Sequence, residues 1–290
     1  MQAVKTKKEK DARYRAERVK PGHIVLLAAL VLLACLFLAP MLISFMSAFK
    51  TNGEILKNPL VLPGGFYTGG FEYLFAKTDF PKAFFNSVFL TVVSECLIIL
   101  IIPMGAYGIA RTQNRLSTAI YTFFLAGMMI PFQAYMVALF RELNTVGIFG
   151  TLAGPVVIYI AGATGFGTLL FTSFVSGIPR EIEEAAHIDG CSSLRTFWQI
   201  VFPLLKPCTA SMVILNGLGI WNDYLMPSLV LPSTGAKTIN VEIYRFAGEL
   251  SSRWDIVFSG VVCGIVPILI VFFALQGYFV KGITAGAAKG

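Results

Sequence analysis

The sequence predicts an all-α, polytopic membrane protein with six transmembrane helices. Of its 290 residues, 56% are hydrophobic and only 13% are charged, which is about half the charged fraction of an ordinary soluble domain. The charged residues are also spaced so that six long stretches contain almost none of them. Because no polar region is left that could form a large soluble module, we expect the chain to lie mainly in a bilayer.

The six stretches predict the spans in order. Each is long enough for the roughly 20 apolar residues that a helix needs to cross about 30 Å of hydrocarbon. The first could instead be a signal peptide, but its apolar run from Ile24 to Met46 exceeds the ~7–15 residues of a signal core, and no small-residue cleavage site follows Pro40. The expected spans lie near residues 24–46, 85–110, 118–140, 152–176, 207–230 and 256–280.

The Lys and Arg residues predict the orientation. Eight of the 23 precede Pro21, and such clusters stay on the cytoplasmic side. Six spans then place both termini in the cytoplasm, with 15 Lys and Arg on inner segments and 8 on outer ones. Topology and contact with anionic lipid therefore explain the net charge of +7 without nucleic acid. We divide the chain into a basic cytoplasmic tail (1–22), a six-helix transmembrane domain (23–281) with an inner loop (177–207), and a cytoplasmic C-terminal tail (282–290).

Residue types that perform catalysis are nearly absent from the sequence. The only histidines, His23 and His187, stand in unrelated places, and the five cysteines show no metal-type spacing. No glycine-rich phosphate loop with its lysine occurs. We therefore expect no catalytic residue, no metal site and no cofactor bound by this chain.

The candidate polar residues in or near the expected spans are Glu95, Asn216 and Asp223. An ionisable side chain that faces lipid is costly, so we expect Glu95 to face the interior of the helix bundle. There it would either form a hydrogen bond with a neighbouring helix or partner subunit, or take part directly in transport.

The inner loop predicts a helix, a sharp turn and a second helix. Pro179 stands where the first helix would begin, and acidic residues follow in its first turn, where they favour the positive end of the helix dipole. Gly190 can adopt the left-handed conformation that ends a helix. Ser192 or Ser193 can then cap the second helix, which carries apolar residues along one side.

In this loop the chain resembles the binding-protein-dependent permeases of ABC importers. Their signature is E-A-A, three residues, G, nine residues, I, one residue and L-P, and this sequence departs from it only in having Phe202 where leucine is usual. The resemblance implies a cytoplasmic coupling helix that docks on an ATPase subunit, whereas the alternative is a generic interfacial helix. The matching residues are Glu184, Ala185, Ala186, Gly190, Ile200 and Pro203.

Two further segments, 237–255 and 279–290, are similar to the smaller, six-span permease of maltose-type carbohydrate importers. This resemblance implies uptake of a sugar or oligosaccharide across a bacterial-type plasma membrane. It also implies a second permease as heterodimer partner, two ATPase subunits that bind ATP and Mg, and an extracytoplasmic solute-binding protein. The implied contacts are Lys289 and Gly290 with the ATPases, and Gly235, Tyr244 and Trp254 with the binding protein.

Other functions are compatible with the sequence. A permease of this family could carry a solute other than sugar. An ion-coupled secondary transporter usually contains inverted repeats and several midplane charges, and a membrane-bound enzyme needs a polar or metal-binding cluster at one depth. The charged residues between 231 and 255, such as Glu242 and Asp255, predict an exposed outer segment. That segment could instead be a lipid-interface loop anchored by Tyr244 and Trp254.

Overall fold

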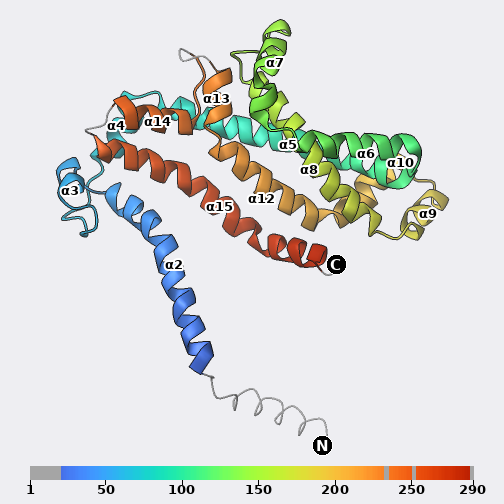
Figure 1. Ribbon diagram of the computed structural model, residues 1–290, viewed down its shortest axis with the longest axis horizontal. Coiled ribbons are helices and arrows are strands. Elements are labelled where there is room, and N and C mark those ends of the chain that lie inside the picture. The colour runs from blue at the N-terminus through green and yellow to red at the C-terminus, as the bar shows by residue number, and fades with distance from the viewer. Residues whose placement is uncertain (1–20, 232–234, 250–252, 288–290) are drawn as a thin grey trace, which may run out of the picture.

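A computed structural model describes residues 21–231, 235–249 and 253–287. These residues form helices and connecting segments without a β-strand, which confirms the all-α prediction (Figure 1). The elements are α2 (Pro21–Ser47), α3 (Asn52–Lys57), α4 (Gly69–Lys77), α5 (Phe80–Thr112), α6 (Arg115–Met128), α7 (Phe132–Thr145), α8 (Ala153–Ser176), α9 (Glu181–Ile188), α10 (Ser193–Thr196), the π-helical turn η1 (Phe197–Val201), α11 (Phe202–Leu204), α12 (Lys206–Asn222), α13 (Leu225–Val230), α14 (Ile239–Glu249) and α15 (Trp254–Ala287).

Six membrane spans are consistent with these helices. Within the described residues, α2, α5, α8 and α15 are each long and apolar enough to cross a membrane. Two bent pairs, α6 with α7 and the α10–α11 segment with α12, reach the same length if each pair is one span. The last helix runs on to Ala287, beyond the expected span end at residue 280.

The expected third span, 118–140, is not one straight helix. It is divided between α6 and α7, whose axes differ by 106°. The break lies at Pro131, which has no N–H to donate and disfavours helical backbone in the residue before it. The apolar run therefore located this stretch correctly but did not show that the helix breaks at Pro131.

The expected fifth span, 207–230, is not one helix either. Its helix, α12, begins at Lys206 and ends at Asn222, because Asp223 has an extended backbone (ψ 123°). A separate short helix, α13, follows. Toward the other end, α12 meets the α10–α11 segment at an angle of 75°.

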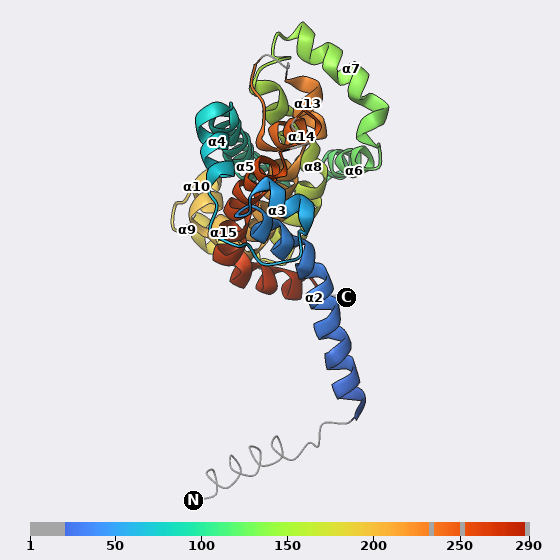
Figure 2. The ribbon, with the colours of Figure 1, turned by 90° about the vertical axis from the view of Figure 1, so that its left-hand side faces the viewer.

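Helix α5 packs against α8, α12 and α14, while α12 also packs on α15. One apolar cluster joins α5, α8, η1 and α12, and includes Ile98, Phe171, Phe197 and Met212. Helix α2 leans away from this bundle and touches α15 (Figures 1 and 2). No residue in the most apolar stretch of α2 is buried, as expected for a helix whose surroundings are themselves apolar.

The short helices gather at the two ends of the bundle. Helices α3, α4 and α14 lie at one end, and α9 and α10 lie at the opposite end (Figure 1). We refer to these as the α14 end and the α9 end. Since α5 runs from one to the other, the bundle has the form expected for spans with polar connections on both sides.

Candidate functional site

The signature loop at the α9 end forms a helix, a tight turn and a second helix. Gly190 has a φ of +84°, the left-handed conformation that glycine adopts most easily. Its N–H donates to the His187 carbonyl, and the N–H of Cys191 donates to the Ala186 carbonyl at 2.9 Å. These two bonds form a Schellman cap. The Ser192 hydroxyl then accepts from the N–H of Arg195 and starts α10.

The first helix of this loop, α9, has one exposed face and one buried face. Glu184 and Ala185 are exposed, whereas Ala186 is buried at 4% exposure. Ala186, one of the signature residues that the resemblance assigns to the coupling helix, packs against this chain instead. An exposed carboxylate beside a small exposed side chain leaves room for another protein surface at Glu184 and Ala185.

A buried carboxylate that sequence reasoning missed fastens this helix to the bundle. Glu183 is 7% exposed. It accepts hydrogen bonds from Arg111 Nε (2.9 Å), Arg111 Nη2 (2.5 Å) and the Tyr107 hydroxyl (2.7 Å). Arg111 Nη2 also donates to the Ile178 carbonyl at 2.9 Å. Nothing in the local sequence pairs Glu183 with a residue 72 positions earlier, so only folding reveals the contact.

The end of the signature lies on an irregular helix. Residues Phe197–Val201 form a π-helical turn directly before Pro203. Proline has no N–H to donate and crowds the preceding turn, so the α-helical hydrogen-bond ladder is locally interrupted there. Ile200 is half-buried and Pro203 is exposed. The 75° bend into α12 follows between Leu204 and Lys206.

At the α14 end, the expected exposed segment is only partly exposed. Glu242 has 0% exposure, Asp255 has 1%, and Ile239 is buried beside them. Glu242 pairs with Arg245 and, at 3.5 Å, with Lys237. The prediction that these acidic residues are exposed is wrong, because each is buried with a cationic partner.

The candidate contacts on this segment differ in exposure. Tyr244 is 65% exposed and stacks on Tyr224 with ring centroids 4.4 Å apart. Gly235 is exposed, and Trp254 is half-buried with its backbone N–H bound to the Asn52 side chain. Tyr244 and Gly235 are therefore accessible to a partner, whereas Trp254 mainly anchors the start of α15.

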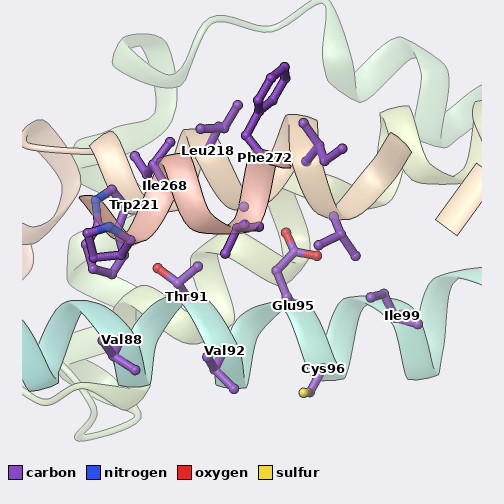
Figure 3. A pocket seen from close by; sticks show the side chains of 15 residues that line it. Val88, Thr91, Val92, Glu95, Cys96, Ile99, Leu218, Trp221, Ile268 and Phe272 are labelled. Carbon is purple, nitrogen blue, oxygen red and sulfur yellow. The ribbon is translucent and has the colours of Figure 1, made fainter. Parts of the chain in front are cut away.

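Inside the bundle, Glu95 is 7% exposed. Its Oε1 accepts a hydrogen bond from Asn216 Nδ2 at 2.8 Å, while its Oε2 is buried and has no hydrogen-bond partner among the described residues. It lines a largely apolar cavity of about 410 Å³ between α5, α12 and α15. Figure 3 shows Glu95 and Thr91 pointing from α5 into this space.

Asp223 occupies the break between α12 and α13. Its Oδ2 accepts from the Tyr159 hydroxyl at 3.0 Å, and its Oδ1 accepts from the N–H of Met226 at 3.2 Å. Both carboxylate oxygens thus hold local structure. The other candidate residues, Lys289 and Gly290, lie outside the described residues, and the described part of the chain contains no group of His, Cys, Asp and Glu that could hold a metal ion.

These features define a polytopic helical protein that carries the signature loop at one end of its bundle. The chain belongs to the family of binding-protein-dependent transport system inner membrane components, whose family model matches residues 97–285. It is therefore a multi-pass inner-membrane transport subunit.

Individual relatives agree with this family. The chain is 35% identical over 259 residues to AmyC of Thermoanaerobacterium thermosulfurigenes, a permease named for the transport of starch degradation products; the match covers 89% of this chain and 94% of AmyC. It is 33% identical to MelC of Bacillus subtilis, a melibiose/raffinose/stachyose import permease, over 95% of this chain and all (100%) of MelC. These matches confirm the predicted family of carbohydrate ABC importer permeases.

Solved structures show the same fold. A chain of a bacterial ABC transporter involved in import of the acidic polysaccharide alginate superposes with a TM-score of 0.78 over 91% of this chain and 98% of that chain, at 22% identity. A second alginate transporter structure, in complex with a periplasmic protein carrying an alginate pentasaccharide, gives a TM-score of 0.69 over 90% of this chain and 94% of that one, at 17% identity. At these identities the likeness establishes the fold alone.

Proposed function

We propose that this chain is one of two permease subunits of an ABC importer for an oligosaccharide or a related sugar. The support for the solute class is that its relatives AmyC and MelC are named for starch degradation products and for melibiose, raffinose and stachyose. The second permease would complete the pathway as a heterodimer. Specificity for one sugar would be shared with the partner permease and the solute-binding protein.

The α9 end is the proposed docking site for an ATPase subunit. The observation that carries this assignment is the Gly190 turn, which holds the exposed Glu184 and Ala185 on a capped helix at one end of the bundle. Two ATPase subunits would bind ATP and Mg, and closure of the pair would move the docking helices and rotate the bundles as rigid bodies. The tail residues Lys289 and Gly290 would add to the same contact.

This assignment fixes the proposed orientation. If the α9 end faces the ATPases, it is cytoplasmic, as are the segments 1–22 and 282–290 on either side of the six-helix domain. The α14 end then faces outward, and Gly235 and Tyr244 can meet the solute-binding protein. The basic segment before Pro21 agrees with this orientation, since Lys and Arg clusters stay on the cytoplasmic side.

The test is a pull-down of the ATPase subunits with the permease, combined with ATP hydrolysis stimulated by loaded binding protein. We expect Glu184→Lys and Gly190→Asp to lower both, because one reverses the charge on the exposed docking face and the other strains the turn. Glu142→Gln, at an exposed position on α7 rather than on the docking helix, is the control. Wild-type association and wild-type stimulated hydrolysis in both variants would refute the docking assignment.

A further inference from the structure

The contact at the α9 end joins the docking helix to α5 through a charged pair. Glu183 lies on α9, and Arg111 lies in the last turn of α5. The guanidinium and the Tyr107 hydroxyl together donate three hydrogen bonds to one carboxylate. Arg180 also donates to the Arg111 carbonyl at 3.3 Å. Arg111 holds Oε1 of Glu183 and the Tyr107 hydroxyl holds Oε2. Because both oxygens are held, and charge-assisted bonds are strong, α9 cannot tilt freely relative to the end of α5.

The other end of α5 is fastened to α14. Ser87 Oγ accepts a hydrogen bond from the N–H of Ile239, the first residue of α14, at 2.9 Å. Asn86 Nδ2 donates to the Lys237 carbonyl at 2.8 Å. Ser87 and Ile239 are both buried, at 3% and 0% exposure. These bonds hold the beginning of α14 on the side of α5.

Between these two contacts α5 is one continuous helix. It has 33 residues, and at about 1.5 Å per residue such a helix extends roughly 50 Å. Buried residues recur along the face between the two contacts, among them Leu90, Ile98, Ile102 and Ala106. The helix continues through Pro103, which is buried in the packed bundle. Close packing resists bending, so displacement at one end reaches the other.

From this arrangement we propose that α5 is the strut that transmits movement between the docking helix and the α14 segment. Arg111 and Glu183 are positioning residues at one end of the strut, and Ser87 is a positioning residue at the other. The proposal rests on the proposed function, in which α9 binds an ATPase and the α14 end faces the binding protein. It adds a route by which a loaded binding protein at one end stimulates ATP hydrolysis at the other.

Helix α12 offers a competing route between the same two ends. It continues the signature loop covalently after the 75° bend, and its Trp221 carbonyl accepts a hydrogen bond from Asn240 of α14 at 2.6 Å. If α12 alone transmitted movement, the Arg111–Glu183 contact could be removed without loss of coupling. The strut proposal requires the opposite result.

The experiment uses the assembled importer in proteoliposomes, with both permeases, the ATPases and the sugar-loaded binding protein. Three quantities are measured: ATPase retained with the permease, basal ATP hydrolysis, and the factor by which the binding protein stimulates hydrolysis. We expect Arg111→Gln and Glu183→Gln each to retain ATPase within about twofold and to lower the stimulation factor at least about fivefold, the lower end of ordinary coupling between sites. Ser87→Ala is expected to lower the stimulation factor in the same way.

The double variant Arg111→Gln/Ser87→Ala separates a strut from two unrelated defects. Contacts that act in series through one element are not additive, so the double variant should lose no more stimulation than the worse single variant. Glu142→Gln, which replaces an exposed carboxylate on α7, is the control and should keep wild-type stimulation.

Two outcomes would overturn the strut. One is wild-type stimulation in Arg111→Gln and Glu183→Gln, which would leave α12 as the route. The other is loss of ATPase retention in parallel with stimulation, which would mean that the ion pair only builds the docking surface. If the wild-type chain itself retained no ATPase, the proposed function would fail rather than the strut. Glu183→Gln keeps one acceptor oxygen for Arg111, and its amide N–H can donate to the Tyr107 hydroxyl oxygen. It therefore provides the test even if Arg111→Gln does not assemble.

Discussion

The α9 and α14 segments are short helices at opposite ends of the bundle, and they use their acidic residues differently. On α9, one carboxylate, Glu183, is fastened to α5, while the neighbouring Glu184 stays exposed. On α14, Glu242 is fully buried with Arg245 and Lys237. The two segments have similarly polar sequences. The difference shows that charge indicates a non-lipid environment and does not by itself indicate which side chains a partner can reach.

The sharpest test of the buried cluster at the α14 end is Glu242→Ala. Removing one partner of a buried ion pair leaves the opposite charges uncompensated and typically costs ~3–5 kcal/mol. Because Arg245 and Lys237 keep some exposure, we expect a loss of unfolding free energy of about 3 kcal/mol. The midpoint of denaturation of the purified permease in detergent measures it.

Glu249→Ala is the matched control for that variant. Glu249 pairs with the same Arg245, but its own side chain is 62% exposed. Exposed pairs are worth about 0–1 kcal/mol, so its denaturation midpoint should stay near wild type. Equal losses in the two variants would show that burial does not distinguish the α14 cluster from a surface ion pair.

A second, smaller effect is expected at the Gly190 turn of the α9 end. A Cβ added there meets no atom within 4 Å, so a side chain would be penalised by the backbone alone. Left-handed backbone costs an L-residue roughly 1–2 kcal/mol, and we expect Gly190→Val to lose about that much local stability. Amide hydrogen exchange over α9 and α10 would detect it.

Gly108→Ala, in α5, is the contrasting variant, because a side chain there should stabilise the helix whereas one at Gly190 should destabilise the turn. A Cβ at Gly108 also meets no atom within 4 Å, and the backbone is not left-handed. Alanine in a helix is favoured over glycine by roughly 0.5–1 kcal/mol. No increase in exchange over α9 and α10 in Gly190→Val would mean that the turn does not set the direction of the second helix.

Tyr107→Phe should lower the local stability of α9 by about 1 kcal/mol, the usual net contribution of one hydrogen bond. The substitution removes the hydroxyl that donates to Glu183 at 2.7 Å and leaves the Arg111 pair in place. The change should appear as faster hydrogen exchange in α9 with little change in α14. A loss as large as that of Glu242→Ala would contradict the view that α9 is held by several partly exposed bonds.

The smallest effect is expected at Glu95, between the two ends. Asn216 donates to only one of its oxygens, and a glutamine can accept the same hydrogen bond through its amide oxygen. Glu95→Gln should therefore keep most sugar uptake and most stability. Loss of uptake with normal assembly would show instead that the carboxylate acts directly in transport.

The sequence by itself determined the features that depend on neighbouring residues. The all-α membrane class follows from long apolar runs, and the Gly190 turn with its Ser192 cap follows from local backbone chemistry. The signature around Glu184 also identified the family. The sequence also contains the cause of the break between α6 and α7, Pro131. Hydropathy nevertheless predicted one continuous span, because the residues on both sides of Pro131 are apolar.

Only the tertiary structure decided which polar residues are reachable and which are buried. The Arg111–Glu183 pair joins residues 72 positions apart, the Asn216–Glu95 bond spans 121, and Ser87 meets Ile239 across 152. Local propensity carries no information about such pairs, since each depends on how long helices pack. Burial of Glu242 follows from the same packing, because α14 lies against α5 and α15 and turns that carboxylate inward with its cations.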